Sequence, residues 1–388
     1  MTDPGRPFDL RRARRAVALA FATQGLVFIS LTTRLPDFAD RWDLTEVHLS
    51  LLLLMIVLLA GAGSVVAEVL ARRRPSAVVL RCGLALVALA LPVVTTAPVL
   101  PVFVAGLAAY GVGLGLVDAS SNMQAVAVEH RYGRPVLPSF HGAWTAGGLG
   151  GASLTLAAGD LPLGWAGVLA VAPLAVLAAP FVGRDEAAAA GEVDVPWRPL
   201  LLVGLGMVLF YMVDSAAATW GPTYLDTTVR APDDLVALAT FPYLLSSLVV
   251  RLAGDRLVAR HGAVPVLRVG AVVAAVALAV VAGAPSWGVA VAGFTLLGAG
   301  VSVIAPLSFS AAARIAGGDP VRVDAVIARF NQFNYLGALL GAVLTGLVGA
   351  GNLRIGFVVP MVLVLAMVPL ARAFAPAGAV TGPGSLRS

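Results

Sequence analysis

The chain has 388 residues, of which 59% are hydrophobic and only 12% are charged, and its mean hydropathy is +0.92. A soluble domain carries about twice that share of charged residues, so a soluble globular fold is excluded. The single cysteine, Cys82, excludes an internal disulfide and a cysteine-based metal site, and we expect neither a metal nor a cofactor.

Long apolar runs recur along the whole chain, which is typical of membrane-spanning helices. The runs are continuously apolar rather than alternating, so a transmembrane β-barrel is not expected. A span has no water to bond with in the hydrocarbon and has to satisfy its own backbone, which favours helices. We therefore predict an all-α membrane protein with twelve transmembrane helices, at residues 16–33, 47–68, 77–94, 101–126, 138–158, 163–182, 199–219, 235–253, 265–283, 288–312, 325–348 and 354–372.

The first apolar run begins at Ala16 and is followed by no cleavage-like site, so we interpret it as the first span rather than a signal peptide. A charged, alanine-rich segment separates the sixth and seventh spans. The sequence thus predicts five parts: a cytoplasmic tail (1–15), a six-helix half (16–182), a cytoplasmic linker (183–198), a second six-helix half (199–372) and a disordered cytoplasmic tail (373–388).

The basic residues are distributed unevenly between the two sides of the predicted membrane. All 26 are arginines, and when the loops are numbered alternately all but four fall on the side of the N-terminus. The positive-inside rule then places both termini in the cytoplasm of a multi-pass protein of the cell membrane, and it supports an even number of spans. The arginines on the cytoplasmic side, here called the basic belt, explain the pI near 10 without a nucleic-acid partner. The four exceptions are Arg34, Arg41, Arg230 and Arg354.

The two predicted halves repeat each other in sequence. The segment Ser64–Gly83 aligns without a gap with Arg251–Gly270, so that Glu68 falls on Asp255. After a slippage of three residues, His141 falls on Asn331. A membrane protein built from two similar halves usually binds its substrate between them and moves one half against the other, and a monomer suffices for this.

Two six-helix halves joined by a cytoplasmic linker resemble the major facilitator superfamily over nearly the full length of the chain. The signature of that superfamily between its second and third helices is an acid followed by basic residues and glycine. The second copy here keeps the pattern at 254–262 (GDRLVARHG), whereas the first copy at 68–75 (EVLARRRP) departs from the usual spacing. The resemblance implies a transporter fold with a gate at these helix ends.

The gate that the resemblance implies consists of five charged residues. We expect Glu68 with Arg73, and Asp255 with Arg256 and Arg260, to latch the two halves together in one state. The alternative is ordinary charge that only fixes the topology.

Two further stretches, 113–122 and 139–148, resemble the MosC/YbjJ-like branch, which is distantly similar to fucose permeases. In fucose permeases an acid on helix 4, implicated in proton coupling, is followed four residues later by an asparagine. Asp118 and Asn122 match this pattern. Gln24 stands where the second acid of that system, on helix 1, is sought.

Three titratable residues inside predicted spans are candidates for proton coupling. Burying an ionised Asp at a helix centre costs roughly 2.5–3.5 kcal/mol, so Asp118 is expected to face a cavity or a partner, either as a proton carrier or as a permanent brace. Asp214, in the seventh span, is expected to line the outer half of the cavity or to brace its helix. An imidazole titrates near neutral pH, and His141 is expected to meet Asp118 or Asn122, or to act as a fixed hydrogen-bond donor.

Other polar and aromatic side chains in the spans are candidates for the substrate cavity. Their amide groups suit a hydroxyl-rich substrate or a cytoplasmic gate. The alternative for Trp220 is a residue of the interfacial aromatic belt. At the outer end of the first span, Arg34 is expected to guard the mouth by pairing with Asp37 or Asp214, or else to reach the headgroups. The cavity candidates are Gln24, Asn122, Trp144, Trp220, Asn331, Asn334 and Tyr335.

From these observations we predict a secondary transporter that moves a small solute by alternating access, coupled to protons, with a preference for a sugar- or cyclitol-like substrate. The alternative is a proton-driven exporter of a drug or secondary metabolite. A membrane enzyme is disfavoured because no carboxylates pair in a loop, and no P-loop sequence for ATP hydrolysis is present. A non-transporting sensor with a carrier fold is the third hypothesis.

Overall fold

The computed structural model describes residues 9–44, 46–157, 161–183, 196–232, 235 and 238–375. The described part of the chain is helical and contains no strand. Most of the predicted linker and the outer parts of both predicted tails lie outside the described residues. The first half comprises α1 (Leu10–Thr33), α2 (Leu35–Trp42), α3 (Glu46–Ala71), α4 (Ser76–Thr96), α5 (Leu100–Tyr132), α6 (Leu137–Ala157), η1 (Leu163–Ala170) and α7 (Val171–Val176).

The second half begins with the long helix that follows the linker and ends in a short 3₁₀ turn. Several of its predicted spans consist of two consecutive helices. Its elements are α8 (Trp197–Thr223), η2 (Tyr224–Thr228), α9 (Phe241–His261), α10 (Ala263–Ala282), α11 (Trp287–Val301), α12 (Ile304–Ala316), α13 (Pro320–Phe330), α14 (Gln332–Val348), α15 (Leu353–Val364), α16 (Met367–Leu370) and η4 (Ala371–Phe374).

Eight helical segments among the described residues are long and apolar enough to cross a membrane by themselves. The remaining predicted spans differ from an ideal apolar helix in identifiable ways. The sixth span is a 3₁₀ helix continued by α7, and the eleventh span is divided between α13 and α14. The helix α9 begins at Phe241, later than the predicted 235, and has Pro242 in its first turn, where a missing N–H is tolerated.

The eleventh span shows how local sequence sets an element that the apolar pattern misses. Its first helix, α13, begins at Pro320 rather than at the predicted 325. Asp319 accepts hydrogen bonds from the backbone N–H groups of Val321 and Arg322, and a proline in the first turn has no N–H to satisfy. The span is then interrupted at Asn331, which separates α13 from α14.

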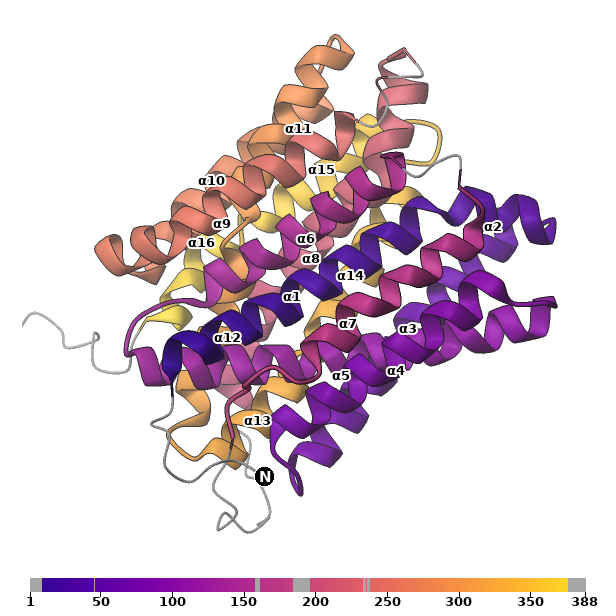
Figure 1. Ribbon diagram of the computed structural model, residues 1–388. Helices are drawn as coiled ribbons and strands as arrows, with labels where there is room; N and C mark the ends of the chain where they lie inside the picture. The colour runs from indigo at the N-terminus through magenta and orange to yellow at the C-terminus, as the bar shows by residue number, and fades with distance from the viewer. Residues whose placement is uncertain are drawn as a thin grey trace, which may run out of the picture.

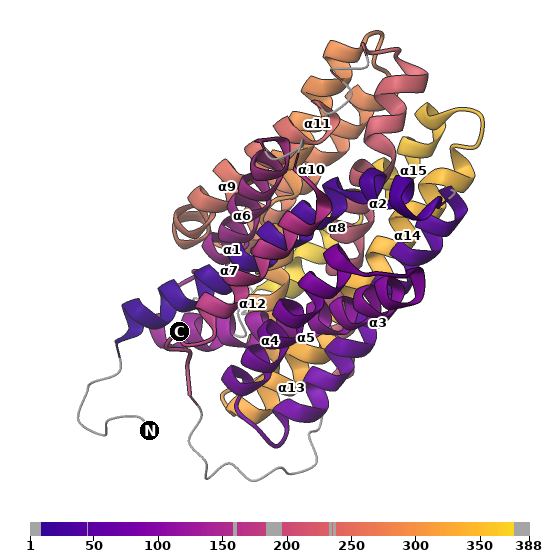
Figure 2. The ribbon, with the colours of Figure 1, turned by 45° about the vertical axis from the view of Figure 1, so that its right-hand side comes forward.

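Figures 1 and 2 show the two halves as adjacent groups of long helices that run roughly along one axis, with the first half in indigo to magenta and the second in red to yellow. Within the first half α1 packs on α6, and α5 packs on both α3 and α4. Within the second half α8 packs on α14 and α10 on α11. Across the halves the main contacts are α6 with α9 and α3 with α13. The fold is thus the predicted pair of helical halves, with an interface that α6 and α9 share.

Glycines allow the closest helix contacts in each half. A Cβ on Gly115 of α5 would lie 1.9 Å from the carbonyl oxygen of Ala60 on α3, and a Cβ on Gly341 of α14 would lie 2.2 Å from that of Met212 on α8. These helices can approach to backbone contact only where no side chain intervenes.

Candidate transport site

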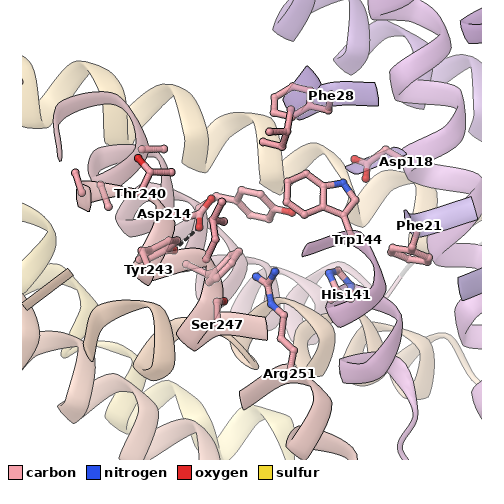
Figure 3. Close-up of a pocket in the computed structure, with 17 residues that line it drawn as sticks. Phe21, Phe28, Asp118, His141, Trp144, Asp214, Thr240, Tyr243, Ser247 and Arg251 are labelled. Atoms are coloured by element: carbon pink, nitrogen blue, oxygen red, sulfur yellow. Dashed lines mark hydrogen bonds between the residues drawn. The ribbon is translucent and has the colours of Figure 1, made fainter. Parts of the chain in front are cut away.

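A cavity of about 200 Å³ lies between the two halves. Its walls come from α1, α5 and α6 on one side and from α8 and α9 on the other, as Figure 3 shows. The lining combines four titratable side chains with aromatic ones. The titratable residues are Asp118, His141, Asp214 and Arg251, and the aromatic residues are Phe21, Phe28, Trp144, Phe210, Tyr211 and Tyr243.

Asp118 lies at the centre of a hydrogen-bond network that joins the two halves. Its Oδ1 accepts a bond of 3.2 Å from the amide of Gln24 on α1. Its Oδ2 accepts bonds from Asn331 (2.8 Å), Asn334 (3.5 Å) and Tyr335 (3.2 Å) of the eleventh span. Every one of these donors is neutral, and no arginine or histidine lies within ion-pair distance of Asp118 in the described part of the chain.

The break between α13 and α14 positions these donors. Asn331 occupies the break, and its amide reaches both Asp118 and, at 3.4 Å, the hydroxyl of Ser64 on α3. Asn334 donates to the side-chain oxygen of Asn331 at 2.7 Å and thereby fixes its orientation. The polar run of the eleventh span therefore contacts the first half of the protein.

Asp214, on α8, accepts a hydrogen bond from the hydroxyl of Tyr243 on α9. Both residues line the cavity. The hydrogen bond of Asp214 therefore lies within the second half, whereas the hydrogen bonds of Asp118 join the two halves.

Arg251 is a functional candidate that the sequence analysis did not select. It lies on α9 with 7% of its surface exposed, and it lines the cavity. Its Nε donates to the backbone oxygen of Ser302 at 3.1 Å, and its Nη1 donates to the hydroxyl of Thr145 on α6, in the other half. The predicted eighth span, 235–253, already contained this arginine, and an ionisable residue inside a span is a functional candidate in its own right. The count of arginines by side of the membrane includes it in the basic belt instead.

His141 lies near the start of α6 and is buried. Its ring packs beside Phe21, at 5.3 Å between centroids, and Phe309, at 6.0 Å. The expected contact of His141 with Asp118 or Asn122 is not formed, because aromatic side chains enclose the imidazole. His141 and Asp118 instead line the same cavity.

Two other cavity candidates lie elsewhere. Asn122 is buried, and its side-chain amide donates to the backbone oxygen of Asp118, one turn earlier on the same helix, at 2.9 Å. The indole N–H of Trp220 donates to the backbone oxygen of Ala342 at 2.8 Å and joins α8 to α14. Trp144 lines the cavity as expected. The amides of Gln24, Asn331 and Asn334 surround Asp118 rather than the cavity.

The end of the bundle where α1 and α6 begin and α9 ends, here called the basic end, is closed by polar contacts between the halves. Arg14 of α1 binds Asp255 of α9 at 3.2 Å and Ser139 of α6 at 2.9 Å. Asp255 also accepts the backbone N–H of Ser139 at 3.0 Å. These contacts join α9 to α1 and α6.

A second closure at the basic end involves Glu68 of α3. This carboxylate binds Arg329 of α13 at 2.8 Å and also Arg72 one turn along its own helix. The predicted partners of the two acids are therefore wrong. The three other predicted gate residues, Arg73, Arg256 and Arg260, are exposed.

At the opposite end, Arg34 binds Asp37 at 2.9 Å and the backbone oxygen of Leu161 at 3.3 Å. Both of these partners belong to the first half. The cavity lining extends toward this end as far as Thr240, which precedes α9. The contacts between the halves thus close the basic end, and the cavity lies on the other side of them.

Comparison with known proteins agrees with this architecture. The family model of the Major Facilitator Superfamily matches residues 203–385. An uncharacterized MFS-type transporter of Yersinia pestis is 27% identical over 373 residues, which cover 92% of this chain and 94% of that protein. The membrane protein MosC of Rhizobium meliloti is 25% identical over 322 residues, which cover 80% of this chain and 77% of MosC.

Solved structures show the same fold. The transporter FucP, crystallised in the outward conformation, matches with a TM-score of 0.78 at 16% identity, covering 94% of this chain and 98% of FucP. A second crystal structure, described as the fucose:proton symporter FucP of E. coli, matches with a TM-score of 0.76 at 14% identity and the same coverage.

Two helical halves around a central cavity define a multi-pass membrane transporter of the secondary class. The chain is similar to the major facilitator superfamily over residues 203–385, has the twelve-helix fold of its members, and resembles MosC.

Proposed function

We propose that this transporter moves a small organic solute together with protons, and that Asp118 carries the proton. The observation that supports this is the buried Asp118 carboxyl held only by neutral donors, three of which belong to the other half. Amide and hydroxyl groups can accommodate a carboxylate or, after reorientation, a carboxylic acid. A fixed ion pair with an arginine would favour the ionised form alone.

Alternating access gives this network a reason to load and release a proton. When the halves 16–182 and 199–372 rotate apart at the basic end, Asn331 and its two neighbours leave with the second half. Asp118 then keeps only the bond from Gln24 within its own half. The free energy of holding a charge on Asp118 therefore differs between the two states, which is the requirement for coupling.

We place the basic end in the cytoplasm, with both termini and the linker 183–198 on that side. All of the 26 arginines support this orientation except the four on the other side and the buried Arg251. The cell membrane is then the site of action, its proton gradient is the energy source, and a monomer is sufficient. We assign no enzymatic step to the cavity.

The nature of the solute follows from the lining. The amides that favoured a sugar or cyclitol surround Asp118 instead, and aromatic rings form much of the wall. This lining favours the alternative class, a drug- or metabolite-like molecule with an apolar body. The match to a fucose:proton symporter keeps a sugar as the rival.

The test is solute-driven proton movement in proteoliposomes with a pH-sensitive dye inside. Wild type is compared with Asp118→Asn and with Asp226→Asn, which removes an exposed acid elsewhere in the protein. Sugars, cyclitols, amphiphilic cations and organic acids are added in turn. We expect at least one solute to drive proton movement that disappears in Asp118→Asn and persists in Asp226→Asn. Proton movement that survives in Asp118→Asn overturns the assignment of the proton to Asp118.

A further inference from the structure

Arg251 carries a positive charge into the centre of the protein without a carboxylate of the described chain in ion-pair contact with it. No Asp or Glu among the described residues lies within 4.0 Å of its guanidinium, although 93% of its surface is covered. Its two hydrogen-bond acceptors, the Ser302 carbonyl and the Thr145 hydroxyl, are both neutral. A buried cation of this kind is costly unless an anion compensates for it.

The guanidinium of Arg251 is held in place, but not all of its nitrogen atoms are hydrogen-bonded. Its Nε and Nη1 are engaged, and Nη2 has no hydrogen-bond partner in the described part of the chain. Thr145 is itself fixed, because its hydroxyl donates to the backbone oxygen of His141 at 3.1 Å. Figure 3 shows the guanidinium directed into the cavity between Asp214 and His141.

Two neighbouring polar atoms in the same cavity wall also lack partners. The Nε2 of His141 and the Oγ of Ser247 are buried and have no hydrogen bond within the described residues. Ser247 lies one turn before Arg251 on α9, and both it and His141 line the cavity with the guanidinium. A buried polar atom without a partner is uncommon. A guanidinium nitrogen, a hydroxyl and an imidazole nitrogen can all donate to one acceptor, so their place in one cavity wall indicates a missing acceptor.

We propose that the central cavity binds a small organic monoanion whose carboxylate contacts Arg251, Ser247 and His141. Arginine suits this role because its planar fork matches the two oxygens of a carboxylate. The carbon body of the anion lies against the aromatic wall, which includes Phe28, Trp144 and Tyr211. One guanidinium compensates for one negative charge, which favours a monoanion over a phosphate or a dicarboxylate.

This assignment rests on the proposed function and names its substrate class. The cavity already contains Asp118 and Asp214. A carboxylate that enters together with one proton leaves the net charge of the cavity unchanged, and Asp118 with its neutral donors is the group that can take the proton. Anion and proton then move together through a site of constant charge.

The experiment measures binding of matched acid and amide pairs to the purified full-length protein by titration calorimetry at pH 7. Benzoate is compared with benzamide, and hexanoate with hexanamide, so that each pair differs only in the charged group. We expect a carboxylate to bind and its amide to bind at least ~30-fold more weakly, because a desolvated charged contact contributes about 2 kcal/mol or more. Equal binding of acid and amide overturns the proposal, as does the failure of every carboxylate to bind.

Three variants locate the contact. Arg251→Gln should weaken carboxylate binding at least ~30-fold, whereas Arg74→Gln removes an exposed arginine outside the cavity and should leave it unchanged. Ser247→Ala deletes a hydroxyl that has no partner in the protein, so it should fold normally and weaken binding about 10-fold. Thermal melting identifies a variant that fails to fold, and Ser247→Ala then decides the question alone. Unchanged carboxylate affinity in Ser247→Ala and Arg251→Gln overturns the proposed site.

The outcome is distinguishable from failure of the proton-coupling proposal. Carboxylate binding that depends on Arg251, without proton movement that depends on Asp118, confirms the anion site and rejects coupling at Asp118. Proton movement driven by a neutral solute, with no carboxylate bound, confirms coupling and rejects the anion site. A requirement for an amine on the ligand, tested with phenylalanine, also rejects it, because a monoanion needs no cationic group.

Discussion

The two junctions between the halves occupy equivalent places in the repeat but have opposite chemistry. At the first, Ser64 of α3 meets Asn331, and the buried charge nearby is the carboxylate of Asp118. At the second, Arg251 takes the position equivalent to Ser64, and His141 takes the position equivalent to Asn331. The buried charge here is a guanidinium, held by a neutral hydroxyl and a carbonyl.

The difference between the two junctions suits a duplicated fold in which one junction binds the proton and the other binds the solute. Both junctions join helices of opposite halves, so both are rearranged when the halves move. A negative group among neutral donors is suited to gain and lose a proton, whereas an arginine remains charged and is suited to hold an anion. One junction is therefore assigned to the coupling ion and the other to the solute.

The backbone packing beneath the first junction gives the largest expected effect. Position 115 is glycine in the first half, and its equivalent in the second half is Ser302. In Gly115→Ala the new Cβ would lie 1.9 Å from the Ala60 carbonyl oxygen and 2.8 Å from the Ser64 nitrogen, so α3 has to move. We expect a loss of about 3 kcal/mol in the free energy of unfolding, and displacement of Ser64 from Asn331.

Thermal melting in detergent checks this, with Gly288→Ala as the matched control. Nothing lies within 4 Å of a Cβ at Gly288 on α11, so the same substitution should be neutral or slightly stabilising there. Equal melting temperatures for the two variants would show that the close contact of α3 and α5 has no energetic weight.

The sequence predicted one junction far better than the other. The sequence analysis selects four polar residues inside apolar spans, Asp118, Asn331, Asn334 and Tyr335, and selects Gln24 from the resemblance to fucose permeases. The structure brings all five together. What the sequence did not show is that these amides bind the carboxylate rather than the cavity. Hydrogen-bond partners depend on the rotation of each helix and on the break at residue 331, and neither follows from apolar periodicity.

The second junction was missed because of its position along a helix. Arg251 lies near the basic belt, so a rule that counts arginines by side of the membrane includes it among topology signals. Its burial depends on the contact of α6 with α9, which is a property of the tertiary structure. The same reason explains the wrong partners of Glu68 and Asp255: ion pairs across the halves join residues far apart in sequence, whereas the motif places arginines beside the acids.

A pair of tyrosines sharpens the comparison between the two buried acids. Tyr335 donates to Asp118 from the other half at 3.2 Å, and Tyr243 donates to Asp214 within one half. Each can be changed to phenylalanine with the loss of a single hydroxyl. Tyr335→Phe should weaken solute-driven proton uptake by up to ~10-fold, the effect of one hydrogen bond, because it removes a donor that the transport cycle makes and breaks.

Tyr243→Phe should leave the proton-to-solute ratio unchanged, because its bond stays within the second half during the cycle. Initial rates of proton and solute uptake, measured together in proteoliposomes, give this ratio. If Tyr243→Phe lowers the ratio and Tyr335→Phe does not, the proton belongs to Asp214 and the assignment of the two junctions has to be revised.

The smallest expected effect concerns the closure of the basic end, which both junctions share. Arg14 is partly exposed, with 30% of its side-chain surface accessible, and pairs with Asp255 at 3.2 Å, so solvent screens the interaction. Such a pair contributes about 0.2–1 kcal/mol, which corresponds to a shift of up to about fivefold in the balance between closed and open states.

Arg14→Gln should therefore increase hydrogen exchange at the Ser139 amide, whose N–H donates to Asp255, by the same factor. Arg15→Gln, which removes the exposed neighbouring arginine, should not. Because Glu68 and Arg329 close the same end independently, the effect stays small unless that pair is also removed, and a large effect from Arg14→Gln alone would make α1 the principal latch.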